Sequence, residues 1–392
     1  MWQEATPPDS NCSPEFKPVN HETIVPADRI SQGLSFKSHS SLESGLIVSK
    51  ASVSAYEDRF QSAWDEYVQR HRLGSIFHLT AWKRVVEKVF KFEARYLFVA
   101  ENGKIRGVLP LFLVSNFLFG RSLISTPIAV YGGICADNEH VKSLLLGAAC
   151  RMAKDEGVQY LELREQWPVE FSEFLTKQLY VTFDLELPGN RDDLLARLPR
   201  DTRYMIRKAQ KNGLEAVVDN TQLNTFYEIY SRSFSHLGTP VFPKRLFAHI
   251  LEEFRDQVEL TTVWSGKRAF ASVLSFRFRD WILPYFGGSL MESRPLAANN
   301  FMYYEVMRYA VEAGVRYFDF GRSKLGSGSH GFKTQWNMRE RALPYKFFLV
   351  RRKSMPNFSP ANPKFSLAVS IWKALPLPVT RILGPAMVRA FP

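Results

Sequence analysis

The chain repeats one long pattern of residues. Tyr131-Gly132-Gly133 is followed by a helical stretch and then by Gly157-Val158, and Phe286-Gly287-Gly288 is followed by a similar stretch and then by Gly314-Val315. These landmarks recur at offsets of 286 − 131 = 155 and 314 − 157 = 157 positions. A repeat of this length exceeds one unit of a solenoid. We therefore expect a duplicated small domain, with a ligand cleft between the copies.

The expected fold class is α/β (α+β), with two tandem copies that each hold a mixed, mostly antiparallel sheet flanked by helices. The turns in Asn102-Gly103-Lys104 and Ser265-Gly266-Lys267 separate apolar runs, which is the pattern of β-hairpins. Apolar periodicity predicts helices, which we place at about 54–71, 80–90, 140–156 and 300–313.

Composition divides the chain into four segments. The first is rich in Ser and Pro and is expected to be disordered, and the breaker cluster Leu187-Pro188-Gly189 separates the two copies. The last is basic, amphipathic and rich in Pro, with a short helix expected at about 365–375. The predicted segments are 1–52 (extension), 53–187 (first domain), 188–350 (second domain) and 351–392 (tail).

The formal charge of +12 is unevenly distributed. Residues 351–392 contain seven basic residues and no Asp or Glu. A second basic run extends from Arg197 to Lys211. Such runs favour anionic partners: phosphate esters, RNA or a lipid surface.

The three cysteines show no paired spacing, which favours a reducing compartment and gives no support for a metal site. No apolar run reaches the roughly 18 residues that a membrane span needs. The N-terminus lacks the basic and apolar regions of a signal peptide. The expected location is the cytoplasm, with the tail as a candidate contact to the inner membrane.

The segment from Tyr285 to Lys333 is the strongest candidate for a site. A strand over 281–287 leads through a crossing into a helix expected to begin at Asn299 and Asn300. Asn is a favoured N-cap, and the free N–H groups of a helix start can bind phosphate or a carboxylate. The alternative is an ordinary capped helix.

After this helix, the strand pattern around Tyr317 brings Asp319 and Arg322 to the cleft. Asp319 is a candidate general base, or it could orient an amine nucleophile. The alternative is a structural carboxylate paired with Arg322 or with a helix start.

The next stretch, 324–333, combines three glycines with Lys324, His330 and Lys333. We expect a flexible loop that folds over phosphate, with Lys333 as an oxyanion or phosphate contact. His330 is a weaker candidate, since a lone loop histidine is more often solvated.

The basic run is predicted to be a helix. Arg200, Arg203, Arg207 and Lys211 fall on one face, where stacked like charges repel unless an anion offsets them. RNA contact through Arg203, Arg207, Lys208 and Lys211 is one reading, a sugar phosphate is another, and a plain solvated face is the third.

These residues together resemble the FemAB-like branch of the GNAT (Gcn5-related N-acyltransferase) superfamily over about 55–392. The motifs that carry the resemblance are Arg203–Leu214, Phe286-Gly287-Gly288-Ser289, Gly314–Ser323 and Phe332-Lys333. The tail motifs Leu349-Val350-Arg351, Asn362-Pro363-Lys364 and Leu375-Pro376-Leu377-Pro378 are most similar to the FemAB proteins associated with exosortase A and PEP-CTERM systems.

The resemblance implies two GNAT-like domains that transfer an acyl or aminoacyl group to an amine of a cell-envelope or exopolysaccharide precursor. It implies acyl-CoA or aminoacyl-tRNA as the donor and a nucleotide- or lipid-linked sugar or peptide as the acceptor. Asp319 and Lys333 would be catalytic, and Arg203, Arg207, Lys208, Tyr285, Asn299, Asn300, Arg322 and Lys324 would bind substrate or phosphate.

One segment departs from the family pattern. Ordinary GNAT enzymes hold CoA with a glycine-containing loop, and the equivalent Ser293–Asn299 lacks both glycines, which counts against CoA. The alternative function is a non-catalytic GNAT-like module that binds a nucleotide or an anionic glycan. The tail has two readings: a basic amphipathic contact to an anionic membrane, or a clasp that packs over the first domain.

Overall fold

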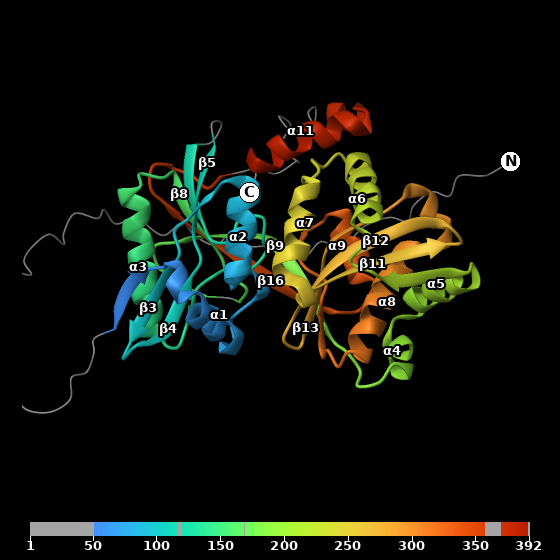
Figure 1. The fold of residues 1–392 in the computed structure, drawn as a ribbon, viewed down its shortest axis with the longest axis horizontal. Helices are drawn as coiled ribbons and strands as arrows, with labels where there is room; N and C mark the ends of the chain where they lie inside the picture. Colours follow the sequence, from blue (N-terminus) through green and yellow to red (C-terminus); the bar gives the residue numbers. More distant parts are fainter. Residues whose placement is uncertain (1–50, 117–119, 168, 357–369, 391–392) are drawn as a thin grey trace, which may run out of the picture. The chain divides into compact units, whose positions relative to one another are not determined.

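The computed structural model describes residues 51–116, 120–167, 169–356 and 370–390 (Figure 1). The predicted disordered extension lies almost wholly outside these residues. Much of the helix predicted at 365–375 also lies outside them.

The helices of the described residues occupy the following ranges: α1 (Gln61–Arg70), α2 (Thr80–Phe90), α3 (Glu139–Asp155), α4 (Asp192–Arg197), α5 (Arg200–Lys211), α6 (Leu223–Leu237), α7 (Lys244–Phe254), α8 (Ala298–Glu312), α9 (Gly328–Thr334) and α11 (Leu377–Ala390). Short 3₁₀ turns are η1 (Asp58–Phe60), η2 (Ile76–His78), η3 (Arg255–Gln257) and η4 (Met291–Leu296).

Within the described ranges, the strands form two sheets. The smaller sheet has the order β1-β3-β4-β7: β1 (Ser52–Ala55), β3 (Leu97–Glu101), β4 (Lys104–Leu109) and β7 (Cys135–Ala136). The larger sheet has the order β10-β11-β12-β13-β14-β9-β16-β8-β6-β5-β2, with β15 paired to β9. Its strands are β2 (Glu93–Ala94), β5 (Phe112–Asn116), β6 (Gly120–Ile124), β8 (Tyr160–Arg164), β9 (Leu175–Glu186), β10 (Leu214–Val218), β11 (Val258–Ser265), β12 (Arg268–Phe278), β13 (Trp281–Ser289), β14 (Tyr317–Asp319), β15 (Ser323–Lys324) and β16 (Arg339–Leu349).

The two halves share one supersecondary unit. In the first, β6 leads through α3 to β8, which pairs parallel with β6; in the second, β13 leads through α8 to β14, which pairs parallel with β13. An antiparallel hairpin precedes each unit, β5–β6 and β12–β13. The predicted fold class is therefore confirmed.

The repeat expected from the sequence is partly wrong, because the two glycine-pair motifs used to align the halves do not occupy equivalent positions. Phe286-Gly287-Gly288 lies inside β13, whereas Tyr131-Gly132-Gly133 lies in an irregular segment after β6. The strand equivalent to β13 is β6, because each is the parallel partner of the strand that follows the helix. The first half has a shorter strand here and an added loop, so the glycine pairs are not structural equivalents.

The last strands of the halves are exchanged. β9, at the end of the first half, lies between β14 and β16, and β16, at the end of the second half, lies between β9 and β8. The predicted boundary after residue 187 follows the end of β9, but one sheet runs through both halves. The division into two domains at this point stays a prediction.

Both predicted hairpin turns are confirmed. Glu101 pairs with Lys104, and the two residues between them have the positive φ that this turn needs, 52° at Asn102 and 72° at Gly103. Ser265 pairs with Arg268, and Gly266 has a φ of 55°.

The first predicted helix begins later than expected. Helix α1 starts at Gln61 rather than at about 54, because Ser52–Ala55 pair with β3 and η1 intervenes. The aromatic spacing that suggested an earlier start instead reflects ring packing, since the Tyr56 and Trp64 ring centroids lie 5.4 Å apart.

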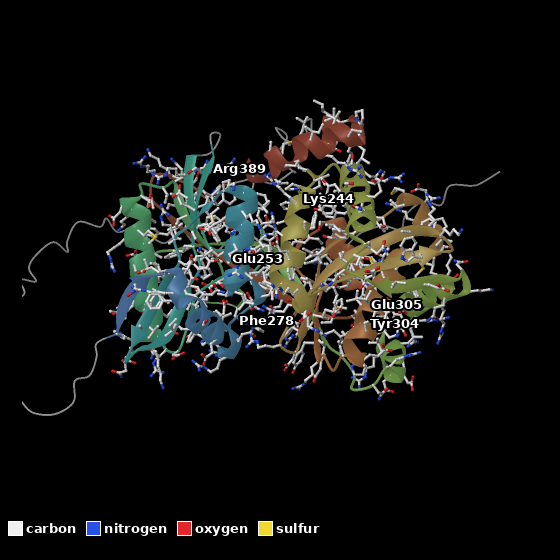
Figure 2. All side chains as sticks on the ribbon, viewed as in Figure 1. Lys244, Glu253, Phe278, Tyr304, Glu305 and Arg389 are labelled. Carbon is white, nitrogen blue, oxygen red and sulfur yellow. The ribbon has the colours of Figure 1, made fainter. Side chains whose placement is uncertain are left out.

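A shared aromatic core joins the halves. The Phe77 ring lies 5.5 Å from that of Phe276, and the Trp82 ring lies 6.3 Å from that of Phe254. Such pairs add about 0.5–1.5 kcal/mol each beyond their buried area. Figure 2 marks Phe278 and Glu253 where the second half meets the first.

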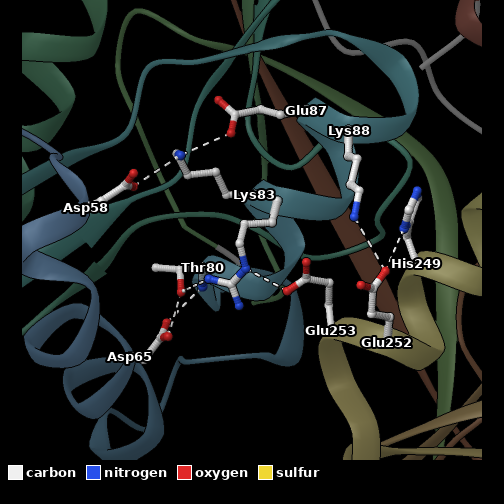
Figure 3. Close-up of polar contacts among 10 residues, drawn as sticks. Asp58, Asp65, Thr80, Lys83, Glu87, Lys88, His249, Glu252 and Glu253 are labelled. Atoms are coloured by element: carbon white, nitrogen blue, oxygen red, sulfur yellow. Dashed lines mark hydrogen bonds and ion pairs between the residues drawn. The ribbon is translucent and has the colours of Figure 1, made fainter.

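Polar contacts between α2 and α7 border this core (Figure 3). The Arg84 Nε atom lies 2.6 Å from Glu253 Oε2, and Lys88 Nζ lies 3.5 Å from Glu252 Oε2. Strand β12 alternates between two clusters: Leu274 and Phe276 face the side of α6 and α7, and Ala271 and Val273 face the side of α5 and α8. The helices therefore cover both faces of this part of the sheet.

The tail contacts both halves: the backbone N–H groups of Arg351 and Arg352 donate to the Gln159 carbonyl oxygen at 3.2 Å, whereas helix α11 packs on the second half. Helix α11 contacts α6, and Arg381 Nε donates to Ser231 Oγ at 3.0 Å (Figure 1). Thr380, Gly384 and Val388, each four residues apart, are buried on the inner face. Ile382 and Leu383 stay 76% and 46% exposed on the outer face. The contact with the first half agrees with the clasp reading, whereas the exposed outer face of α11 is the surface that the membrane reading requires.

Candidate functional site

Asp319 lies at the end of β14 and is buried with partners in both halves. Its Oδ2 accepts from Tyr131 Oη at 2.5 Å, and its Oδ1 accepts from Thr182 Oγ1 at 2.7 Å and from the Gly321 N–H at 2.8 Å. Burial, and then the charge of Asp319, hold the pKa of Tyr131 well above its usual value. The phenol thus remains a donor. The carboxylate connects the first half to the second.

Lys333 lies on α9 and points toward the segment that follows Asp319. Its Nζ donates to the carbonyl oxygens of Phe320, Gly321 and Arg322 at 2.6, 2.8 and 3.3 Å. Burial lowers the pKa of Lys333 to about 8, and the charge of Asp319 opposes this shift. All three ammonium protons are matched by backbone acceptors, which hold the turn after β14 in place.

An irregular loop of the first half, residues 126–134, is fixed by side chains from three strands. The carbonyl oxygen of Ile128 accepts from Tyr285 Oη at 2.8 Å, that of Ala129 accepts from Arg164 Nη1 at 2.8 Å, and that of Val130 accepts from Tyr345 Oη at 3.0 Å. These bonds supply partners for backbone groups that burial removes from water.

The loop backbone is strained and tightly packed. Thr126 and Ile128 are β-branched, yet they have φ values of 44° and 68°. A Cβ atom added at Gly132 would lie 1.8 Å from Thr126 Oγ1, and one at Gly133 would lie 2.0 Å from Glu165 Oε2. The two glycines therefore allow a close approach that no larger residue permits.

Two Leu-Pro-Tyr motifs place the tyrosines that hold this loop. In β13 the register shifts so that Pro284 pairs with Ser275 and Phe286 pairs with Leu274, which leaves Tyr285 as the extra residue of a bulge. Between Leu343 and Tyr345 of β16 the register also shifts, and here the extra residue lies in the partner strand β9, between Tyr180 and Lys177. Proline is tolerated at bulges because the ladder is interrupted there. Each bulge re-aims its tyrosine toward the 126–134 loop.

Arg322 lies on an aromatic surface beside these residues. Its Cζ is 4.5 Å from the Tyr180 ring centroid and 5.8 Å from that of Tyr345, and its Nη1 donates to Tyr345 Oη at 3.1 Å. The residue is exposed. The predicted site residues Tyr285, Asp319, Arg322 and Lys333 are therefore brought together.

Lys324 lies in β15, where it pairs with Tyr180 of β9. The flexible loop predicted over 324–333 is partly wrong, because residues 328–334 form α9. The Ser327 side chain accepts from the His330 N–H and caps this helix. His330 Nε2 lies 3.3 Å from Glu340 Oε2.

The predicted N-cap at Asn299 and Asn300 is wrong. Helix α8 begins at Ala298, and Ala297, with a φ of 59°, is the capping residue without a side-chain bond. The preceding 3₁₀ turn η4 brings the chain into the helix earlier than the asparagines suggested. Both asparagines lie in the first helical turn, where Asn300 is buried.

The basic helix forms as predicted, at α5, but its cations lie apart from Asp319. Arg203 Nη1 donates to the carbonyl oxygens of Ala196 and Leu198 at 2.9 and 3.1 Å, so it closes the end of α4. Arg207 is exposed and Lys208 is half-buried. The buried face of α5 packs on α8.

The sequence analysis missed Arg164, Lys177, Tyr180 and Tyr345. The repeated Leu-Pro-Tyr was a usable signal for Tyr345, since proline inside an apolar strand pattern indicates a bulge. The other three are brought in by strand pairing between distant segments.

Among the described residues, no group of three or more His, Cys, Asp or Glu could hold a metal ion. Within the same residues, no helix has the length and apolar character needed to cross a membrane.

Residues 196–334, from α4 to the end of α9, match the family model described as Acetyltransferase (GNAT) domain. The fold is similar to that of FemX, with 17% identity, a TM-score of 0.61, and coverage of 76% of this chain and 98% of FemX. No curated protein sequence matches the chain.

Two further solved structures share the fold. The C-terminal domain of a putative lysylphosphatidylglycerol synthetase from Agrobacterium fabrum has 13% identity and a TM-score of 0.51, over 81% of this chain and 96% of that one. A conserved protein of unknown function from Bacteroides thetaiotaomicron has 10% identity and a TM-score of 0.52, over 76% and 99%. The domain match supports an acyl-transferring enzyme, and the likeness to FemX supports the fold.

Proposed function

We propose that the chain is an N-acyltransferase that moves an acyl or aminoacyl group onto an amine of a cell-envelope or exopolysaccharide precursor. The observation that carries the proposal is the convergence of Tyr285 and Asp319, both inside the matched GNAT segment, on the 126–134 loop of the other half. Arg322 of the same segment donates to Tyr345, which bonds to this loop. A site built from both halves can hold two substrates against each other. Such positioning can supply much of the rate enhancement of an acyl transfer.

The bulge at Tyr285 is the proposed position of the acyl carbonyl. Tyr285 is the extra residue of the bulge in β13, and its backbone N–H is the group proposed to polarise the carbonyl oxygen. Asp319 and Lys333 are engaged by three partners each, so we assign them to positioning. Asp319 would hold the loop, and Lys333 would hold the turn that presents Arg322.

The donor is proposed to be acyl-CoA or an aminoacyl-tRNA. GNAT domains use acyl-CoA, and the first turn of α8 offers N–H groups without a side-chain cap. The missing loop glycines and the basic face of α5 favour tRNA instead. The test incubates the protein with acetyl-CoA or with charged tRNA, together with an amino-sugar nucleotide or a short amine-bearing peptide.

Mass spectrometry of the acceptor shows whether an acyl or aminoacyl group has been transferred to it. An acceptor heavier by one acyl or aminoacyl group is expected with one donor class. Saturable donor binding with no product under any pairing would contradict the proposal and favour the non-catalytic binding module.

The proposed setting is the exopolysaccharide and PEP-CTERM/exosortase pathway of the family resemblance, at the cytoplasmic face of the inner membrane. The outer face of α11 supports the membrane contact, because Ile382 and Leu383 are exposed and no Asp or Glu follows Glu340 in the sequence. An exposed apolar helix face among cations suits the headgroup region of an anionic bilayer.

A further inference from the structure

Arg341 lies on β16 next to the residues that bond to Asp319. It pairs with Thr182 of β9, whose Oγ1 donates to Asp319 Oδ1 at 2.7 Å. Directly opposite residues of an antiparallel pair share one face of the sheet, with Cβ atoms roughly 5 Å apart. Burial and the charge of Asp319 raise the pKa of Tyr131, and the charge of Arg341 opposes this rise. The Arg341 guanidinium therefore lies close enough to interact with the Tyr131–Asp319 pair.

The Arg341 guanidinium is bonded through two of its nitrogen atoms. Nη1 donates to the carbonyl oxygen of Gln166, and Nε lies 3.4 Å from Asp184 Oδ1. Asp184 makes closer contacts with Arg339, whose Nε and Nη2 lie 2.8 and 2.6 Å from Oδ2. The third nitrogen of Arg341, Nη2, is buried and has no hydrogen-bond partner within the part of the chain that the structure describes. Arginine keeps its charge in proteins, so these N–H groups remain donors.

Arg308 of α8 is a comparable arginine in which every nitrogen is bonded. Its Cζ lies 4.2 Å from the Tyr309 ring centroid, and its side chain is 18% exposed, against 11% for Arg341. Its Nε and Nη2 bind Glu305 at 2.8 and 2.7 Å, and its Nη1 binds Glu312 at 2.7 Å. A buried donor without an acceptor is destabilising, so the contrast indicates that Arg341 bonds to an acceptor from outside the chain.

Trp167 covers one face of the Arg341 guanidinium. The Cζ lies 3.9 Å from the ring centroid, which is a stacking distance, and the tryptophan is half-buried. An acceptor must therefore approach the edge of the guanidinium, in a plane that runs below the indole. A carboxylate is planar and can lie flat in this plane, whereas the oxygens of a tetrahedral phosphate cannot.

We propose that Arg341 binds a carboxylate of the acceptor through Nη2, with Trp167 covering the bound group and Asp184 holding the guanidinium in position. The proposal rests on the proposed function and adds a substrate class to it: an acceptor that carries a carboxylate as well as the amine. Arg341 and Trp167 lie outside residues 196–334, the GNAT segment to which we assign the donor, so the carboxylate is assigned to the acceptor. Because Nη2 is buried, the Trp167 side chain moves aside to admit the carboxylate and then closes over it.

The first experiment compares a lysine tripeptide that ends in a free carboxylate with the same tripeptide ending in a carboxamide. Binding of each to the full chain is measured by ligand-observed NMR. The carboxylate form should bind at least about tenfold more tightly, the lower end for one charge-assisted hydrogen bond. Arg341→Gln should remove this preference. Arg308→Gln is the matched control and should keep it, because the bonds of Arg308 stay within α8.

Tryptophan fluorescence tests the movement of Trp167. The carboxylate tripeptide should change the emission of the native chain and should leave that of Trp167→Phe unchanged, a difference that a merely structural Arg341 would not produce. Urea unfolding checks that each variant folds. If Arg341→Gln does not, Arg341→Lys keeps the charge without the planar fork and should retain an intermediate preference.

A second arm identifies the source of the carboxylate. An aminohexuronic acid and the corresponding aminohexose form another matched pair, and the pair whose difference depends on Arg341 shows whether the acceptor is a sugar or a peptide. No preference for the carboxylate in either pair would overturn the proposal. Equal losses in Arg341→Gln and Arg308→Gln, displacement of the tripeptide by orthophosphate but not by acetate, or dependence on Arg341 only for a carboxyl-bearing acyl-CoA would also overturn it.

Transfer assays separate this proposal from the proposed function. Equal transfer to the carboxylate and carboxamide forms would refute the carboxylate site and leave the proposed function intact. Arg341-dependent binding of the carboxylate form, without transfer from any donor, would refute the proposed function and leave the carboxylate site.

Discussion

The bond between Tyr131 and Asp319 provides a quantitative test of the proposed contact between the halves. Tyr131→Phe removes one donor from a buried carboxylate, at a contact of 2.5 Å, and leaves Oδ2 without that partner. A hydrogen bond to an ionised group contributes about 1.5–3 kcal/mol, and a neutral one contributes about 0.5–1.5 kcal/mol. We expect Tyr131→Phe to lower the free energy of unfolding by about 2–3 kcal/mol.

Tyr285→Phe is the matched control. Its hydroxyl donates to a neutral acceptor, the Ile128 carbonyl oxygen, at 2.8 Å, so its loss should cost about 1 kcal/mol. Both variants keep the ring, and both hydroxyls bind across the two halves. Urea unfolding followed by tryptophan fluorescence gives the midpoint, and an unchanged m-value shows that the comparison is valid.

A double-mutant cycle separates charge from geometry. In an Asp319→Asn background the acceptor is neutral, so Tyr131→Phe should cost only about 1 kcal/mol, a coupling of about 1–2 kcal/mol. If Tyr131→Phe costs no more than Tyr285→Phe in the native background, or if the coupling is zero, the charged connection inferred from the structure does not exist in solution.

Three further predictions follow from the same contacts. The pKa of Lys333 is lowered to about 8, so the folded state binds fewer protons than the unfolded state between pH 8 and about 10.5. The free energy of unfolding should therefore rise by up to about 3 kcal/mol across this range. Urea unfolding of the native chain and of Lys333→Met at a series of pH values should show the rise in the native chain and its absence in the variant. The partly exposed pair of Arg84 and Glu253 should give a coupling of about 0.5–1 kcal/mol in an alanine double-mutant cycle, and a coupling that does not fall in 1 M salt would contradict its ionic character. Ile382→Asp should reduce severalfold the fraction of protein that floats with anionic vesicles, whereas Val217→Asp, at an exposed position of β10, should not. Equal effects of the two substitutions would argue against a membrane contact through α11.

Local features were predictable from the sequence. The turn at Asn102-Gly103 and helices α2 and α5 depend on residues that are neighbours in the chain, so dihedral preference and apolar periodicity were sufficient. The start of α8 was missed because Ala297 adopts a positive φ that its residue type does not suggest. Residues 328–334 were predicted as loop because glycine disfavours helix, although they form a short helix capped by Ser327.

The candidate site was only half predictable. Asp319, Arg322 and Lys333 lie within 15 residues of one another in a single motif-rich segment, so their proximity could be inferred from the sequence. Tyr131, Lys177 and Arg164 come from other strands, and only the ladders β14–β9–β16–β8 bring them near. Register across 150 or more residues depends on tertiary packing, which a local pattern does not encode.

The exchanged strands have a consequence for synthesis on the ribosome. β8 obtains its second neighbour only when β16, residues Arg339–Leu349, has been made and has left the exit tunnel. Until then the nascent first half carries an open β8 edge through the translation of more than 170 residues, as 339 − 164 = 175. Such an edge is a template for wrong pairing, and closing loops of this length is slow. The chain should therefore gain its protease resistance late and in one step, and it should depend on chaperones that bind open strand edges.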